Sequence, residues 1–189
     1  MKLFVWTVAM LGATFFVILG GVIALATPVA SSWDTAPVRF PHVQGSNLEK
    51  QDFNLPSDFQ GQHNLLLVAF EREQQKDVDT WLKEMKRFEE VDPGFYYYEL
   101  PTIERPNTLM RWFIDSGMRR GIPDRKARER TITLYLDKKQ FCAALQIVDQ
   151  KRIYEFLVDR SGNVLWRSEG VFDETKGVSL QRALGEHRP

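Results

Sequence analysis

The sequence contains a single cysteine, Cys142, among its 189 residues. One cysteine excludes an intramolecular disulfide and any motif of paired redox cysteines, so the core alone must hold the folded part together. The three histidines, His42, His63 and His187, are scattered without the spacing of metal ligands. We therefore expect surface or linker positions for them, no metal site and no cofactor.

The sequence also lacks net charge, since 25 basic side chains balance 25 acidic ones. A balanced chain is not typical of a nucleic-acid-binding protein, and we expect no nucleic-acid partner. There is no internal repeat and no low-complexity tract. The length suits one domain with a proper core.

Charge is absent altogether from one stretch, Leu3–Ala26. As a helix it would cover ~36 Å, enough to cross the ~30 Å hydrocarbon core of a bilayer with some tilt. The alternative is a cleaved signal peptide, which the small residues of Ala24-Leu25-Ala26 would suit, but the length favours a retained anchor. Lys2 precedes the run, and the positive-inside rule then leaves the amino terminus in the cytosol. This predicts a single-pass protein of the inner (cytoplasmic) membrane, with its soluble domain on the periplasmic side.

The remainder divides by composition. Residues 1–27 form the anchor or signal segment, and residues 28–48 mix Pro, Ser and Gly without periodicity, which is typical of a linker. Residues 49–189 form the domain, which begins with Leu65–Phe70, a continuous apolar run of the kind found in strands buried on both faces. Val78–Phe88 has helical spacing, with Asp77 as a candidate N-cap.

Further along, helices and strands alternate. We expect strands at 95–100 and 131–136, helices at 107–122 and 138–147, a hairpin around Arg160–Asn163, and a closing helix from Asp173 interrupted at Gly177. This order predicts an α/β domain with a mixed central sheet and helices on both faces.

Three segments resemble the thioredoxin superfamily in its peroxiredoxin-like form. They are FNLPSDFQG (residues 53–61), the strand LLLVAF running into a helix, and FLVDRSGNVLWRSEG (156–170) with its Asp-x-x-Gly turn. The resemblance implies a thioredoxin-like fold. In that superfamily the junction between the first of these strands and the helix carries a reactive cysteine. Here the junction reads Glu71-Arg72-Glu73-Gln74-Gln75-Lys76.

Within the superfamily the chain is most similar to the ATP synthase assembly factors, which chaperone the membrane-embedded a subunit (subunit 6) of the Fo sector. The matching features are Phe70 and Arg72 after the strand, Trp81 in the next helix, and the segments 98–130 and 135–170. The family hairpin usually carries arginine before its tryptophan, whereas here Arg167 follows Trp166. The resemblance implies an assembly chaperone that acts on a membrane-protein client, with an ATP synthase Fo subunit as the candidate client.

The chemistry of the chain supports a protein without redox activity. Thiol catalysis needs a low-pKa thiolate, commonly at a helix N-terminus, and residues 71–77 offer none. Residues 149–152 also lack the proline that forms the cis turn of thioredoxins. Cys142 lies on an amphipathic helix, where a buried structural cysteine is expected. The alternative is a single-cysteine thiol reductase or peroxidase that uses Cys142.

A basic segment, RRGIPDRKARER (119–130), is the main candidate for contact with an acidic partner or lipid headgroups, and its alternative is a solvated loop. Trp81 and Trp112 fall on apolar helix faces and are expected in the core. Trp166 is the best candidate for an exposed aromatic anchor. The candidate partner-binding residues are Arg72, Arg119, Arg120, Arg125, Arg128, Trp166 and Arg167.

Overall fold

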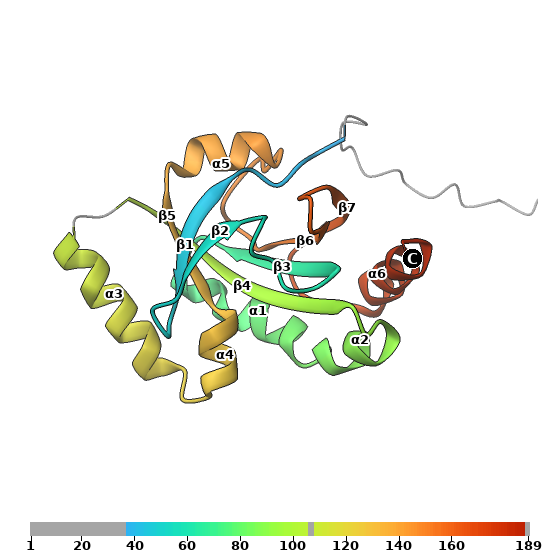
Figure 1. Cartoon of the computed structure of the whole chain (residues 1–189), viewed down its shortest axis with the longest axis horizontal. Coiled ribbons are helices and arrows are strands. Elements are labelled where there is room, and N and C mark those ends of the chain that lie inside the picture. The colour runs from blue at the N-terminus through green and yellow to red at the C-terminus, as the bar shows by residue number, and fades with distance from the viewer. Residues whose placement is uncertain (1–36, 106–107, 188–189) are drawn as a thin grey trace, which may run out of the picture. The chain divides into compact units, whose positions relative to one another are not determined.

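The computed structural model describes residues 37–105 and 108–187, and over Thr108–Phe113 it describes the backbone alone. Within these ranges the strands form one mixed sheet in the order β2-β1-β5-β4-β3-β6-β7 (Figure 1). The strands are β1 (Val43–Asn47), β2 (Asp52–Leu55), β3 (His63–Ala69), β4 (Phe95–Glu104), β5 (Ile132–Leu136), β6 (Tyr154–Asp159) and β7 (Val164–Glu169). The helices are η1 (Arg72–Gln74), α1 (Gln75–Leu82), α2 (Met85–Val91), α3 (Thr108–Gly121), α4 (Arg125–Arg130), α5 (Lys138–Ala144) and α6 (Glu174–Glu186).

β3 lies in the centre of the sheet because its side chains are apolar on both faces. It runs parallel to β4 and antiparallel to β6, with Leu67 opposite Glu99 on one side and Glu155 on the other. Leu65 and Leu67 face α1, α2 and α6, where they pack with Trp81 and Leu180. The predicted mixed sheet with helices on both faces is confirmed.

The opposite face of the sheet is covered by α5 and by the chain that precedes β1 (Figure 1). Phe40 packs edge-to-face on Phe59 and on Phe141 of α5, with ring centroids 5.7 and 5.8 Å apart. Its amide donates to the carbonyl of Gly162 in the β6–β7 turn, and Gly162 has the positive φ of 81° expected there.

The amino-terminal boundary of the domain differs from the prediction. Residues 43–47 were assigned to the linker, yet they form β1 and pair with both β2 and β5. Their mixed composition hid a strand whose partners lie far along the chain. The domain therefore includes at least the stretch from Val38, whose carbonyl accepts a hydrogen bond from Val164.

Two helix predictions were also wrong in detail. Val78–Phe88 belongs to two helices, with a break at Lys83–Glu84, and Asp77 lies inside the first turn of α1 instead of capping it. The closing helix α6 continues through Gly177 without interruption. A Cβ at this glycine would lie 2.8 Å from the Phe172 ring, so the position provides close packing.

The histidine prediction failed at His63, which is 5% exposed. Its Nδ1 faces the Asp92 carboxylate, and its Nε2 lies 3.1 Å from the carbonyl oxygen of His187. This contact fastens the end of α6 to the start of β3. Among the described residues no helix has the length and apolar character to cross a membrane, and the predicted anchor Leu3–Ala26 lies outside them.

Candidate functional site

The β3–α1 junction is the first candidate site, because it occupies the position of the reactive cysteine in the resembling superfamily. The chain leaves β3 at Phe70 and turns through η1 into α1. Gln74 is the buried residue of this turn, 5% exposed, whereas Glu71, Arg72 and Glu73 are exposed. The predicted polar junction is present, and one of its side chains points inward.

The Gln74 side chain forms hydrogen bonds with backbone groups of the junction and of the loop that leads into β6. Its Oε1 accepts hydrogen bonds from the amides of Phe70 (2.8 Å) and Glu71 (3.3 Å), and its Nε2 donates to the carbonyl oxygen of Gln150 (2.7 Å). A thiolate at such a turn would be stabilised by free backbone amides, as at a helix N-terminus. Here the Gln74 side chain binds the amides of the two residues that precede η1, in a capping box with Glu71.

The loop opposite the junction, Gln146–Arg152, leads into β6. It contains no proline, and the cis peptide bond found among the described residues joins Leu55 to Pro56, outside this loop. Val148 in this loop is 82% exposed, and exposed Arg72 belongs to the facing turn. The exposed side chains of the junction and of this loop include Arg72, Glu73 and Val148.

Cys142 lies on α5 near the same loop. It is 8% exposed, and its Sγ accepts from the side-chain nitrogen Nε2 of Gln150 at 3.8 Å. Burial raises the pKa of the Cys142 thiol, which the Gln150 contact and the charge of Lys138 oppose. The thiol borders a hollow of about 390 Å³ together with Lys138 and Lys139. The buried position matches the expected structural cysteine.

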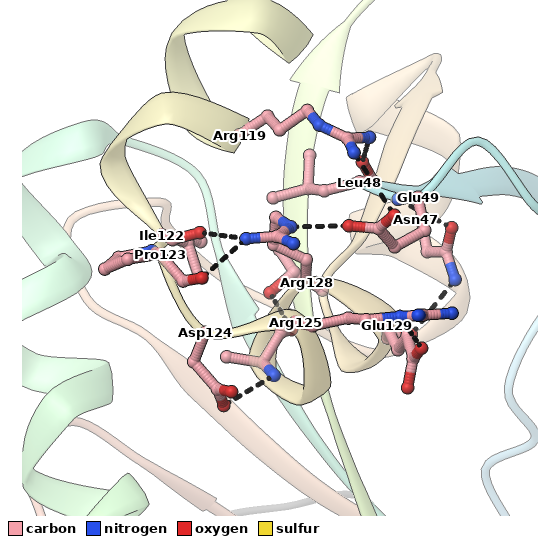
Figure 2. Close-up of polar contacts among 12 residues, drawn as sticks. Asn47, Leu48, Glu49, Arg119, Ile122, Pro123, Asp124, Arg125, Arg128 and Glu129 are labelled. Carbon is pink, nitrogen blue, oxygen red and sulfur yellow. Dashed lines mark hydrogen bonds and ion pairs between the residues drawn. The ribbon is translucent and has the colours of Figure 1, made fainter.

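The predicted basic segment, residues 119–130, comprises the end of α3, a short connection and α4, and most of its arginines form contacts within the protein. Asp124 caps α4 by accepting from the amides of Lys126 and Ala127. Figure 2 shows the guanidinium of Arg128 between the Glu49 carboxylate and the carbonyl oxygens of Ile122 and Pro123. The guanidinium donates to all three, through Nε to Glu49 and through Nη1 to the two carbonyl oxygens.

Arg119 reaches the same acidic residue. It donates to the carbonyl oxygen of Leu48 at 2.7 Å and to the Glu49 carboxylate at 3.2 Å (Figure 2). A hydrogen bond from Arg128 holds the pKa of the Glu49 carboxyl below its usual value, and the charges of both arginines add to this. These contacts attach α3 and α4 to the segment that follows β1.

Three further arginines of the segment are also engaged. Arg125 pairs with Glu129 at 2.9 Å, and Arg120 donates to the carbonyl oxygen of Ser116 at 3.2 Å. Arg130 pairs with Glu89 at 2.9 Å and stacks on the rings of Tyr96 and Tyr97. Arg119, Arg125, Arg128 and Arg130 are therefore each paired with a carboxylate of the same protein.

Trp166 is half-buried in place of the exposed position that we expected. Its ring packs edge-to-face on Trp81 with centroids 6.1 Å apart, and its indole nitrogen donates to the hydroxyl of Ser179 at 3.0 Å. Arg167 donates to the side-chain oxygen of Gln146 at 3.0 Å. Of the predicted partner-binding residues, Arg72 lies at the junction, while Trp166 and the basic segment lie on other elements.

Two buried glutamates were missed from the sequence. Glu99 in β4 is 5% exposed and Glu155 in β6 is fully buried, and they flank Leu67 on the face that carries α1. Burial raises the pKa of both carboxyls, and that of Glu155 lies well above its ordinary value. The sequence does contain a signal for them, because the strand segments FYYYEL and YEFLVD each include a glutamate. Acidic residues are rare in strands that are covered on both faces.

A second, wider hollow of about 1340 Å³ runs along β1, β2, β5 and α5. Its walls mix apolar side chains such as Phe53 with the charged side chains of Asp52 and Arg105. Among the residues that the structure describes, no three His, Cys, Asp or Glu side chains are grouped so that they could hold a metal ion.

No protein-family model and no curated protein sequence matches the chain. Solved structures do match. The thioredoxin domain of a thiol-disulfide oxidoreductase from Bacteroides vulgatus has 19% identity and a TM-score of 0.54, over 80% of this chain and 99% of that one. A putative electron transfer protein from Aquifex aeolicus VF5 has 11% identity and a TM-score of 0.55, over 78% and 96%.

A third match is BsSco, a member of the Sco family of cytochrome c oxidase assembly proteins. It has 13% identity and a TM-score of 0.51, over 82% of this chain and 98% of that one. At these identities the likeness concerns the fold alone. The domain has a thioredoxin-like fold, as the motifs predicted.

Proposed function

We propose that this protein is a redox-inactive, thioredoxin-like binding protein that assists the assembly of a membrane complex. The Leu3–Ala26 segment holds it in the inner membrane with its domain in the periplasm. The observation that carries the proposal is the Gln74 side chain, which fills the β3–α1 junction and bonds Phe70, Glu71 and Gln150. A junction filled by Gln74 has no thiol for disulfide exchange. It contacts other proteins through its exposed side chains.

The binding surface in this proposal is the exposed rim of the junction. Arg72 and Glu73 border it on one side and Val148 on the other. Val148 is a large apolar side chain that is 82% exposed, and apolar contacts of this kind gain most when a partner covers them.

Strand addition is a less suitable mode of binding, because both edges of the sheet are occupied in part. At β2 the amide of Asn54 donates to Asp58 Oδ2 at 2.6 Å, and the Asp58 amide returns a bond to the Asn54 carbonyl. At β7 the Lys176 ammonium caps the Glu169 carbonyl at 2.8 Å. Edges blocked in this way resist pairing with another chain, which favours contact through side chains.

The client in this proposal is a membrane protein, and the family resemblance makes an ATP synthase Fo subunit the first one to test. The fold is compatible with assembly work, since BsSco belongs to a family of assembly proteins. A membrane tether would raise the effective concentration of the domain near such clients.

The second candidate is a single-cysteine thiol reductase or peroxidase. It is favoured by the location of Cys142 beside the junction loop, on a hollow that Lys138 also lines. Burial of the thiol and its raised pKa work against it, because the thiolate is the nucleophile.

Site-specific photocrosslinking in intact membranes tests the binding proposal. A photoreactive amino acid replaces Val148, and in a matched control it replaces Val178, which is 50% exposed on α6. We expect a defined membrane protein to be captured at position 148 and not at position 178, and Arg72→Glu to reduce its yield. Equal capture at both positions, or none at 148, would contradict the proposal. A third variant at Asn54 tests the wide hollow, and capture there alone would reject the junction rim.

A further inference from the structure

Glu99 belongs to a row of side chains on the face of the sheet that carries α1, between Thr131 and Leu67. Across neighbouring strands the row runs from Thr131 through Glu99, Leu67 and Glu155 to Ser168. Glu99 also lies beneath the first turn of α1, where Gln75 Nε2 donates to its Oε2 at 3.0 Å. A buried carboxyl in this position connects three separate elements.

The two contacts of the Thr131 hydroxyl bear on whether the Glu99 carboxyl carries a proton. Thr131 Oγ1 lies 2.8 Å from the carbonyl oxygen of Ala127 in α4 and 3.3 Å from Glu99 Oε1. A hydroxyl has one proton to donate, and the carbonyl cannot donate at all. If Thr131 donates along the shorter contact, the longer one joins two oxygens and needs a proton on Glu99.

We propose that a proton on Glu99 Oε1 links the start of α1 to the end of α4 through Thr131, and that loss of this proton loosens both junctions. In the protonated state the chain of donors is complete. Gln75 donates to Glu99, Glu99 donates to Thr131, and Thr131 donates to Ala127. This proton link does not depend on which partner binds at the exposed rim of the β3–α1 junction.

Loss of the proton breaks the chain at one of two places. Either the Glu99 carboxylate and the Thr131 hydroxyl oxygen repel each other, or Thr131 turns its proton to Glu99 and gives up Ala127. The first outcome displaces Glu99 beneath Gln75, and the second leaves the Ala127 carbonyl with the Thr131 backbone amide in place of two donors from that residue. Since the carboxyl is buried, the charge has no water to stabilise it.

The charged groups around Glu99 leave it without a cation of its own. On α1 the nearest is Asp79, which also accepts from Gln75 Nε2 at 3.1 Å. On β4 the phenol of Tyr97 faces the same side, and its neighbour Arg130 is already paired with Glu89. Leu67 separates Glu99 from Glu155 on β6. These neighbours favour the neutral carboxyl.

Amide hydrogen exchange of the full chain from pH 5 to pH 8 tests the link. The reporters are the amides of Gln75, which donates to the Arg72 carbonyl, and of Thr131, which donates to the Ala127 carbonyl. Glu99→Gln keeps a donor toward Thr131 and an acceptor for Gln75 without a titrating proton. At each pH the exchange rate of the wild type is divided by that of the variant, which cancels intrinsic exchange.

We expect this ratio to rise with pH at both amides by roughly three- to tenfold, the effect of one net hydrogen bond. Thr131→Val removes the hydroxyl that accepts the hydrogen bond from protonated Glu99. When the exchange rate of Thr131→Val is divided by that of Glu99→Gln, the pH dependence should therefore be absent as well. Glu155→Gln, in the same row but without a bond to Thr131, should leave the pH dependence at both amides unchanged. A ratio that stays constant with pH would overturn the proposal. So would a pH dependence that persists in Thr131→Val or disappears in Glu155→Gln.

Discussion

Gln74 donates a hydrogen bond of 2.7 Å to the carbonyl oxygen of Gln150, and so joins the start of α1 to the loop before β6. These residues lie 76 positions apart in the sequence. The contact spans the place where the resembling superfamily exchanges thiols.

Replacement of Gln74 by alanine should destabilise the domain. The change removes one donor and one acceptor and leaves the Phe70 amide and the Gln150 carbonyl without this partner. We expect a loss of about 2–4 kcal/mol in the free energy of unfolding, measured by urea denaturation. The control is Gln140→Ala, at an exposed glutamine of α5, which should change it by less than about 0.5 kcal/mol. Equal effects would mean that Gln74 has no special role.

Glu155→Gln should stabilise the protein, and increasingly so at higher pH. Neither carboxyl oxygen of Glu155 has a hydrogen-bond partner of normal geometry among the described residues. Burial raises the pKa of this carboxyl well above 4.5, its ordinary value, despite the nearby Lys176 and Ser168. The folded state therefore binds the proton more tightly than the unfolded state does, so wild-type stability falls as pH rises from 4.5 through the folded pKa.

The measurement is the difference in unfolding free energy between Glu155→Gln and the wild type from pH 4 to pH 8. It should grow by at least about 1.4 kcal/mol, the equivalent of one pKa unit. Glu186→Gln, at an exposed position of α6, should show no such growth. A difference that shrinks as pH rises would contradict the raised pKa.

Arg128→Ala should lower the denaturation midpoint several times more than Arg125→Ala. Arg128 is 16% exposed and donates to Glu49, Ile122 and Pro123, whereas Arg125 is 76% exposed and pairs with Glu129 alone. Exposed pairs within one helix contribute little. Thermal denaturation of the two variants at the same pH gives the comparison, and equal shifts would show that Arg128 is not a structural arginine.

Cys142 should react slowly with an alkylating reagent in the native protein and fast after denaturation. The thiol is 8% exposed, and burial raises its pKa, which reduces the fraction of thiolate. The rate of labelling is followed by mass spectrometry at pH 7.5, with the same protein in urea as the reference. Native labelling as fast as that in urea would favour the enzymatic alternative.

The central elements of the fold could be predicted because their signals are local. β3 is a continuous apolar run, and the β6–β7 turn carries Gly162 with positive φ. The strand β1 was missed, since VQGSN has no apolar alternation and is held by its partners β2 and β5. The break between α1 and α2 at Lys83–Glu84 contains no glycine or proline, so no local signal marked it in the sequence.

The side-chain contacts at the candidate sites are the part that sequence reasoning could not reach. Glu49, which binds Arg128, lies 79 positions away, and Asp92 lies 29 positions from His63. No periodicity connects such residues. The arginines therefore looked available to a partner, and the histidine looked exposed.

The most direct test of the account is the reduction of insulin disulfides by the full chain in the presence of a dithiol reductant. The Cys142→Ala variant and a reaction without protein serve as references. We predict that wild type and variant both match the reaction without protein, because the β3–α1 junction contains Gln74 and no thiol. Turnover above that level that disappears in Cys142→Ala would contradict the account.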